Sequence, residues 1–219
     1  MAMSTIGTAL WSFALVVGLL TLTPGLDTAL ILRTSAVGRR RRAWGVVLGI
    51  QTGTLLWGAL TSLGVTALLT ASHLAYTALR WAGAVYLVWM GVRMLRDTFA
   101  PGGQGRSGAE AAESALLSGA DTVGGGWRQG TLTNLLNPKM GAFYVAVLPQ
   151  FIPAGVSHFT MGLLLTTVHI LLGLVWSAVL IGFARVLRDW LRKPRARRLL
   201  DRITGTVIAG FGIRLALGD

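Results

Sequence analysis

Long runs of apolar residues alternate with short polar segments along the chain. Six runs stand out, at 6–32, 43–69, 74–95, 127–148, 159–186 and 199–217. A helix of about 20 residues crosses a hydrocarbon core of about 30 Å, and each run is close to that length or longer. The pattern predicts an all-α polytopic membrane protein with six transmembrane helices. Asp201 and Arg202 weaken the start of the sixth run, so five spans is the alternative.

Two of the runs contain a polar residue followed by proline, in "TLTPGLDTALIL" and "NLLNPKMGAFYV". Thr and Asn are good N-caps, and proline is best tolerated at the first position of a helix. Thr23-Pro24 and Asn137-Pro138 therefore predict fresh helix starts within broken spans. The N–H groups left free at a helix start would need a polar site enclosed by protein. A plain proline kink satisfied by neighbouring helices is the alternative.

Asp27 and Lys139 accompany the two prolines deep inside these runs. A charge at the centre of a span costs about 2.5–3.5 kcal/mol on insertion scales, so such residues usually pair or face a cavity. A structural ion pair is one interpretation, and a solute or proton site is the other. The set proposed to bind solute or proton is Thr23, Pro24, Gly25, Asp27, Asn134, Asn137, Pro138 and Lys139. Gln51 and His169 are secondary members, and His169 could relay protons or simply pack.

The two halves of the chain resemble each other. "RWAGAVYLVWMGVRML" and "RITGTVIAGFGIRLAL" share Arg, Gly and Val spacings, and each half contains one of the Pro motifs. Three spans per half would make the halves inverted repeats, as in many secondary transporters. We predict repeats at 1–95 and 127–219, joined by a flexible connector at 96–126, of which eight residues are glycine.

Basic residues define an orientation. Of the 20 Lys and Arg residues, 17 fall in the alternate segments 33–42, 93–128 and 185–202. Cytoplasmic loops carry such an excess, so both termini are predicted outside. The net charge of +12 then reflects topology and contacts with anionic lipids, and no nucleic-acid motif is present. The chain has no cysteine, and no cofactor or metal site is expected.

Three stretches carry a family resemblance: "LTPGLDTALILRTSAVGRRRRAWGVVLGIQTG", "AGAVYLVWMGVRMLRD" and "GTLTNLLNPKMGAFYVAVLPQF". The chain resembles the LysE-type amino-acid exporters, which include threonine and homoserine efflux proteins. The resemblance implies a bacterial inner-membrane exporter of amino acids or small derivatives, driven by proton antiport. Leu26 stands where the family commonly has proline, which implies a small local change in the helix start.

Other functional classes fit the sequence less well. A hydrolytic enzyme usually needs paired acids or a nucleophile motif, and an ATP-driven pump needs a Walker-type loop; neither pattern occurs. A passive channel or a non-transporting membrane subunit is the alternative function. Gly45, Gly49 and Gly53 form a ridge suited to helix packing within the chain or in a homodimer. The tryptophans suit interfacial belts and lipid-facing surface, and none is assigned to the solute.

Overall fold

The computed structural model describes residues 2–23, 25–36, 38–71 and 121–184, with isolated positions between 74 and 96 and between 186 and 213. The regular structure of the four continuous stretches is entirely helical, which confirms the predicted fold class at this level. Three of the helices, α1, α3 and α8, are long and apolar enough to cross a membrane. The elements are α1 (Ala2–Leu22), α2 (Leu26–Ala36), α3 (Arg40–Ala71), α6 (Val123–Leu135), α7 (Pro138–Ala146), the short 3₁₀ helix η1 (Leu148–Phe151) and α8 (His158–Gly182).

The predicted runs correspond to these helices in two ways. Runs 43–69 and 159–186 lie largely within α3 and α8, whereas 6–32 and 127–148 are each divided between two helices, α1 with α2 and α6 with α7. Helix α6 begins at Val123, inside the predicted connector, because the Thr122 hydroxyl caps it by accepting the Gly125 N–H at 3.2 Å. Runs 74–95 and 199–217 lie mostly outside the described residues, with only isolated positions described, so the count of six spans stays a prediction.

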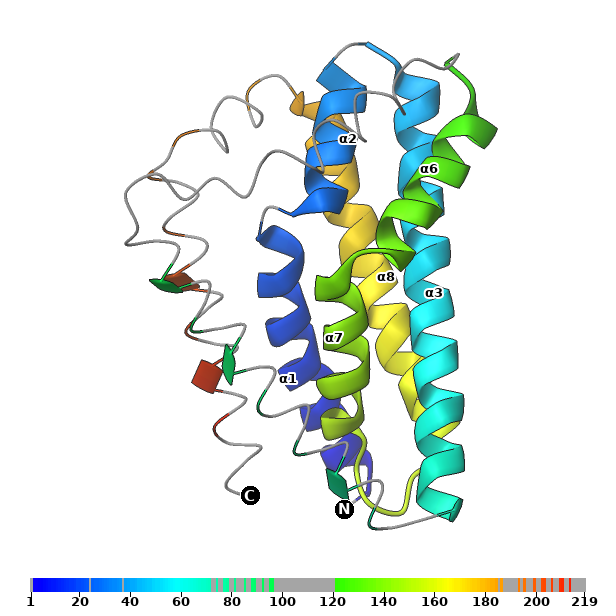
Figure 1. Ribbon diagram of the computed structural model, residues 1–219, viewed down its shortest axis with the longest axis vertical. Coiled ribbons are helices and arrows are strands. Elements are labelled where there is room, and N and C mark those ends of the chain that lie inside the picture. Colours follow the sequence, from blue (N-terminus) through cyan, green and yellow to red (C-terminus); the bar gives the residue numbers. More distant parts are fainter. Residues whose placement is uncertain are drawn as a thin grey trace.

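The two broken helices run in opposite directions through the bundle. Figure 1 shows α1 continuing into α2 from one end to the other, while α6 continues into α7 the opposite way. The breaks lie at about the same height, and the long helix α3 packs along both α6 and α8. This arrangement brings the two chain breaks together in the middle of the bundle.

Helices α3 and α6 meet backbone to backbone along a glycine seam. A Cβ at Gly49 would overlap the carbonyl oxygen of Trp127, and one at Gly130 would overlap the carbonyl oxygen of Val46. Small residues allow this close approach of helices in a membrane. The predicted glycine ridge is therefore used for packing within the chain. The glycine seam consists of Gly45, Gly49 and Gly53 of α3 and Gly126 and Gly130 of α6.

Apolar packing is divided into two clusters. One joins α1, α7, η1 and the start of α8 around Phe13, Phe143 and Phe151, whose rings meet at centroid distances of 5.9 Å and 5.3 Å from Phe13. The other joins α2, the first turns of α3 and the end of α8 around Leu30 and Leu180. The two helix breaks lie between these apolar clusters, and polar side chains replace apolar ones there.

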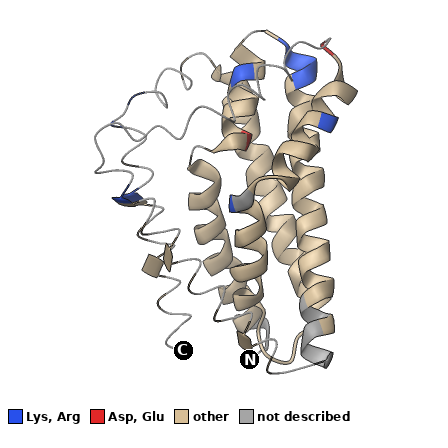
Figure 2. Ribbon diagram, viewed as in Figure 1, with Lys and Arg blue, Asp and Glu red and all other residues tan. Residues whose placement is uncertain are grey.

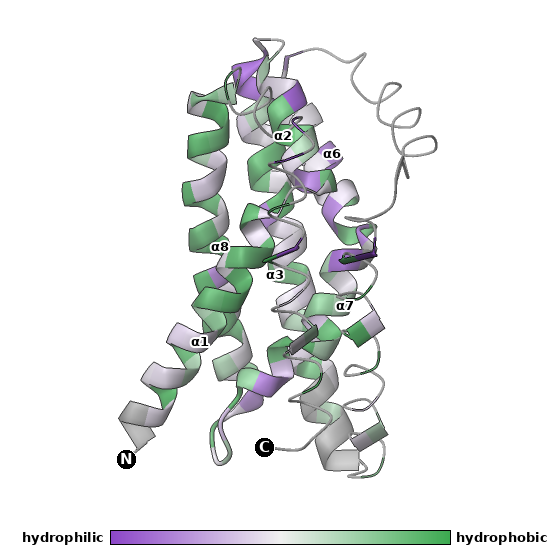
Figure 3. Cartoon of the chain, turned by 90° about the vertical axis from the view of Figure 1, so that its left-hand side faces the viewer, coloured by the Kyte–Doolittle hydropathy of each residue, from purple (hydrophilic) through white to green (hydrophobic). Residues whose placement is uncertain are grey.

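Charge and hydropathy follow the long axis of the bundle. Within residues 2–71 and 121–184, every Lys and Arg except Lys139 lies near the end where α2 stops and α3 and α6 begin (Figure 2). The shafts of the long helices are mostly hydrophobic (Figure 3), and large side chains such as Trp11 and Leu15 are exposed on them. Exposed apolar side chains along the shafts are what a lipid environment requires.

Candidate functional site

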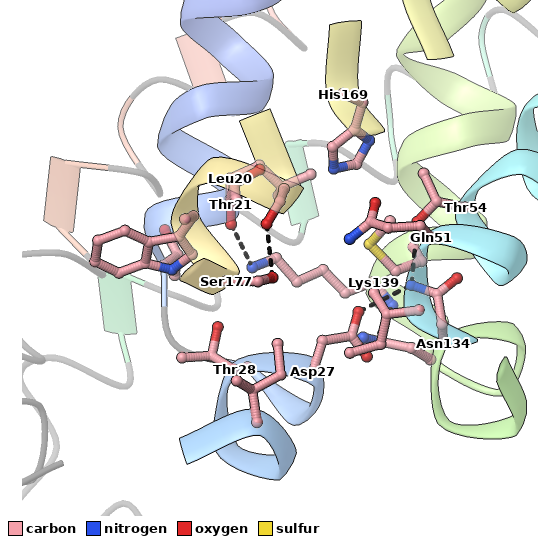
Figure 4. Close-up of a pocket in the computed structure, with 18 of the residues that line it drawn as sticks. Leu20, Thr21, Asp27, Thr28, Gln51, Thr54, Asn134, Lys139, His169 and Ser177 are labelled. Atoms are coloured by element: carbon pink, nitrogen blue, oxygen red, sulfur yellow. Dashed lines mark hydrogen bonds between the residues drawn. The ribbon is translucent and has the colours of Figure 1, made fainter. Parts of the chain in front are cut away.

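A cavity of about 70 Å³ lies at the level of the two breaks, and its walls come from six helices (Figure 4). Most of the predicted site residues line it: Thr23, Gly25, Asp27, Asn134, Asn137 and Lys139, together with Gln51 and His169. Pro24 and the side chain of Pro138 lie outside the described part of the chain. The fold therefore gathers residues from four separate stretches of sequence around one polar space.

The first break differs in detail from the predicted helix start. The N–H and the hydroxyl of Thr23 both donate to the carbonyl of Leu19, at 3.1 Å and 2.8 Å, so Thr23 closes α1. Helix α2 begins at Leu26, and the carbonyl of Gly25 accepts its first bond, from the Ala29 N–H at 2.9 Å. Helix α2 therefore begins two residues after the predicted start at Pro24, and the Thr23 hydroxyl donates to the carbonyl four residues back, as threonine often does.

The second break is the predicted helix start. Asn137 caps α7: its side-chain oxygen accepts the Lys139 N–H at 3.1 Å, and Pro138 is the first helical residue. Proline fits this position because the N–H it lacks would have no partner within the helix. The capped residue, Lys139, extends its side chain toward the first break.

Lys139 joins the two broken helices. Its Nζ donates to the carbonyl of Leu20 at 3.2 Å, in the last turn of α1. The same Nζ lies 3.9 Å from the point that a Cβ on Gly25 would occupy, so the ammonium sits directly beside the break. A cation is favourable at a helix C-terminus, where carbonyl groups lack intrahelical donors.

Asp27 has a different partner. Asn134 Nδ2 donates to Asp27 Oδ2 at 2.9 Å and lies 3.5 Å from the hydroxyl of Thr54. These contacts join α2, α6 and α3, and Asn134 is completely buried. Asp27 also occupies the first turn of α2, where the helix dipole favours a carboxylate. Each of the two deep charges thus has its own hydrogen-bond partner at the wall of the cavity.

Three buried polar atoms on the lining side chains have no hydrogen-bond partner. They are Asp27 Oδ1, Asn134 Oδ1 and Trp176 Nε1. Leaving such an atom unpaired costs about 1–3 kcal/mol, and more for a charged group. Buried polar atoms are nearly always paired with protein, water or ligand, so these three atoms are exceptions. Asn134 Oδ1 packs against α3, 2.6 Å from the position that a Cβ on Gly53 would occupy.

Part of the α8 face that lines the cavity was not predicted from the sequence. Tryptophan is typical of lipid-facing surface, yet Trp176 lines the cavity together with Gly173, Ser177 and Leu180. These residues follow His169 at helical spacings of four, seven, eight and eleven, and that periodicity is the signal that could have revealed the face.

His169 is both packed and exposed to the cavity. Its Nδ1 lies 2.9 Å from the hydroxyl of Tyr144, and the two rings stack with a centroid distance of 5.8 Å. Gln51 faces it from α3, with its amide 3.1 Å from the Cβ position of Gly173. This geometry is the hydrogen-bonded packing that was one interpretation of His169 from the sequence, and the proton relay stays a prediction.

Comparison with known proteins assigns the chain to a group of relatives. The family described as LysE type translocator matches residues 18–219. A homoserine/homoserine lactone efflux protein of Salmonella typhimurium is 29% identical over 94% of this chain and 96% of its own. A threonine efflux protein of Salmonella typhi is 28% identical over 90% and 91%, and a leucine efflux protein of Enterobacter is 24% identical over 94% of each chain. No solved structure gives a significant match.

Proposed function

Because the chain belongs to the LysE type translocator family, whose members are transporters and not enzymes, we propose that it exports amino acids or small amino-acid derivatives. Export would proceed across the bacterial plasma membrane in exchange for protons. The observation that carries this proposal is the polar cavity where two oppositely directed broken helices meet, with a carboxylate and an ammonium on its wall. Efflux proteins of similar sequence, named for homoserine, threonine and leucine, support the solute class.

The cavity matches the two charges of an amino acid. Asp27 Oδ1 has no hydrogen-bond donor and suits the solute ammonium. The positive charge of Lys139 would attract the solute carboxylate while its Nζ holds Leu20. Thr23, Gly25 and Asn137 complete the wall at the two breaks. A site with opposite charges on separate helices favours zwitterions over singly charged solutes.

Proton coupling would use the same carboxylate. Asp27 can carry a proton when no solute is bound, so solute ammonium and proton would compete for one group. One charge crossing 100 mV is worth about 2.3 kcal/mol, which would support roughly 50-fold accumulation. His169 is a further titratable side chain on the wall, beside Asp27 and Lys139, and would carry a proton toward Asp27 or away from it.

Alternating access would follow from an inverted repeat. The pair α1–α2 followed by α3 corresponds to the pair α6–α7 followed by α8, and the broken helices run in opposite directions (Figure 1). Gln51 and His169 are each the twelfth residue of their helices, α3 and α8, and both line the cavity. We propose repeats at 1–95 and 127–219 that rock about the cavity, with both termini outside.

An efflux panel tests this function. Cells expressing the protein are loaded with labelled amino acids, and the rate of loss is compared with cells carrying the Asp27→Asn variant. Saturable loss of at least one amino acid is expected, and a protonophore should stop it while ATP stays high. Export that continues after both membrane potential and pH gradient collapse would contradict proton coupling. Flux that never saturates would indicate a channel.

A further inference from the structure

His169 borders the cavity with one of its two ring nitrogens. Its Nδ1 lies 2.9 Å from the hydroxyl of Tyr144, a fully buried residue that is not part of the cavity wall. His169 itself lines the cavity together with Gln51 (Figure 4). Among the described residues Nε2 has no hydrogen-bond partner, and it is not one of the fully enclosed polar atoms, so it is the nitrogen open to the cavity. What His169 can do there depends on whether Nε2 carries a hydrogen.

Aromatic contacts fix the ring of His169 in place. The imidazole stacks on the Tyr144 ring with an interplanar angle of 13°, and the Phe143 ring packs edge-on at a centroid distance of 5.8 Å. Phe143 and Tyr144 belong to α7, the helix that also carries Lys139. An imidazole held in this way cannot turn over without losing its contact with the Tyr144 hydroxyl. Its two nitrogens therefore have separate surroundings.

A chain of hydroxyl groups behind His169 has a fixed direction. It ends at the carbonyl of Gly162, which accepts from the Thr166 hydroxyl at 2.7 Å, and a carbonyl can only accept. The Thr166 hydrogen is thereby used, so Thr166 can only accept from its other hydrogen-bonding neighbour, Tyr144. When the Tyr144 hydroxyl donates to Thr166, its oxygen is left to accept from His169, and Nδ1 must carry a hydrogen.

The opposite arrangement makes fewer hydrogen bonds. If Tyr144 donated to Nδ1, its hydrogen would no longer reach Thr166, and the buried chain would have two hydrogen bonds in place of three. Hydrogen bonds in one chain strengthen each other, which favours the continuous arrangement. The continuous chain also needs no change when His169 takes up a proton, because the added proton goes to Nε2 while Nδ1 keeps its own.

We propose that Tyr144 and Thr166 are positioning residues that keep the hydrogen of neutral His169 on Nδ1 and so present the lone pair of Nε2 to the cavity. Nε2 then takes a proton from a group or a water in the cavity and returns it from the same atom. The charged groups that share the cavity wall are Asp27 and Lys139. This inference rests on the proposed function, because it assigns the atom through which His169 would relay protons.

Nitrogen NMR in lipid bilayers tests the tautomer. The protein is made with 15N-labelled histidine, and the signals that a His169→Gln variant lacks belong to His169. While His169 is neutral, Nδ1 should carry the hydrogen in the wild type. Thr166→Val removes the acceptor of the Tyr144 hydroxyl, so Tyr144 should donate to Nδ1 and the imidazole hydrogen should move to Nε2. Thr167→Val is the matched control, because this neighbouring hydroxyl is exposed and donates to the carbonyl of Leu163.

Export measurements test whether the tautomer matters for transport. The solute is whichever of L-threonine, L-homoserine and L-leucine the wild type exports from proteoliposomes with a pH gradient. Tyr144→Phe keeps the stacked ring and removes the hydroxyl, so it should lower the maximal rate at least about tenfold. The KM should stay within about twofold, since Tyr144 does not line the cavity. In the His169→Gln background, Tyr144→Phe should cause no further loss, because Tyr144 acts through His169.

The outcomes separate the two proposals. Wild-type His169 with its hydrogen on Nε2 would overturn the tautomer, whatever the protein transports. An equal loss from Tyr144→Phe with and without His169 would show that the hydroxyl does not act through the imidazole, and the positioning role would fall. Export that persists after the proton gradient collapses would instead remove the proton coupling of the proposed function.

Discussion

Asp27 and Lys139, the two charged residues at the level of the helix breaks, make different contacts. Lys139 donates to the Leu20 carbonyl at the broken end of α1, and Asp27 accepts from Asn134 through Oδ2 while its other oxygen, Oδ1, is buried without a hydrogen-bond partner. Each charge is thus compensated by a separate polar group on a different helix. Because these hydrogen-bond partners are separate, we expect the two charges not to behave as a mutually dependent ion pair.

Charge removal at these two positions gives a clear expectation. Breaking a buried ion pair by removing one partner costs about 3–5 kcal/mol, and removing both can be neutral. For separately partnered charges, Asp27→Asn and Lys139→Gln should each lower export at least about tenfold. The double variant should reach the membrane at normal levels and export no better than either single variant. Quantitative blots and efflux assays check this, and recovery of export in the double variant would restore the ion-pair interpretation.

The two helix breaks are formed in different ways. Helix α1 is closed by the hydroxyl of Thr23 and by the Lys139 ammonium, whereas α7 opens with an asparagine cap and a proline. Lys139, whose backbone N–H is held by the cap, also donates through its Nζ to the last turn of α1. The capped start of α7 therefore contributes a contact between helices that are far apart in the sequence.

Loss of the α7 cap should affect both stability and export. Asn137→Ala removes the acceptor for the Lys139 N–H and should cost about 1 kcal/mol. Asn137→Ser restores a capping oxygen of similar strength and should recover most of the loss. Thermal unfolding in detergent and efflux should be measured for both variants. Equal behaviour of the alanine and serine variants would show that the cap does not matter.

The glycine seam offers a test of helix packing. Gly49→Ala would place a methyl group on the backbone of Trp127 and Thr131, where no flexible side chain can move aside. Overpacking of this kind costs about 1–3 kcal/mol, so the unfolding temperature should fall. Gly64→Ala is the matched control on the same helix, because nothing lies within 4 Å of its Cβ position. That variant should be neutral or stabilised, since alanine is the better helix former.

The whole molecule has one strongly basic end. In the continuous described stretches, Lys139 is the one basic residue away from that end. Arg42 is buried there, with Nη2 donating to Gln129 Oε1 at 3.0 Å and its backbone N–H donating to Asp121 at 2.8 Å. The start of α1 lies at the opposite end (Figure 1). If the basic end faces the cytoplasm, the N-terminus is outside.

Single cysteines in this cysteine-free chain test the orientation. Ala154 is exposed in the loop between η1 and α8, and Arg41 is exposed at the basic end. Ala154→Cys should react with an impermeant maleimide in intact cells, and Arg41→Cys should react only after lysis. The reverse pattern would invert the topology and place both predicted outer termini in the cytoplasm.

Sequence reasoning found the helix breaks because they depend on local chemistry. A cap followed by proline, as in Asn137-Pro138, and a charge such as Asp27 or Lys139 can be recognised in any apolar run from the sequence alone. It could not find the bond from Lys139 to Leu20, because a backbone carbonyl 119 residues away leaves no trace in side-chain identity. The contact of Gly49 with Trp127 could not be predicted either, because a ridge of small residues does not specify which helix packs on it. Trp176 was misjudged because tryptophan is also typical of lipid-facing surface.

The glycine seam has a consequence for how the protein is made. Gly49 leaves the ribosome 78 residues before its partner Trp127. At about 5–20 residues per second, the α3 face waits roughly 4–16 s in the bilayer before α6 is synthesised. During that interval the close-packing surface of α3 is open to mispairing with other helices that carry small residues. We therefore expect the yield of this protein in a cell to depend on the speed of translation through the segment between α3 and α6.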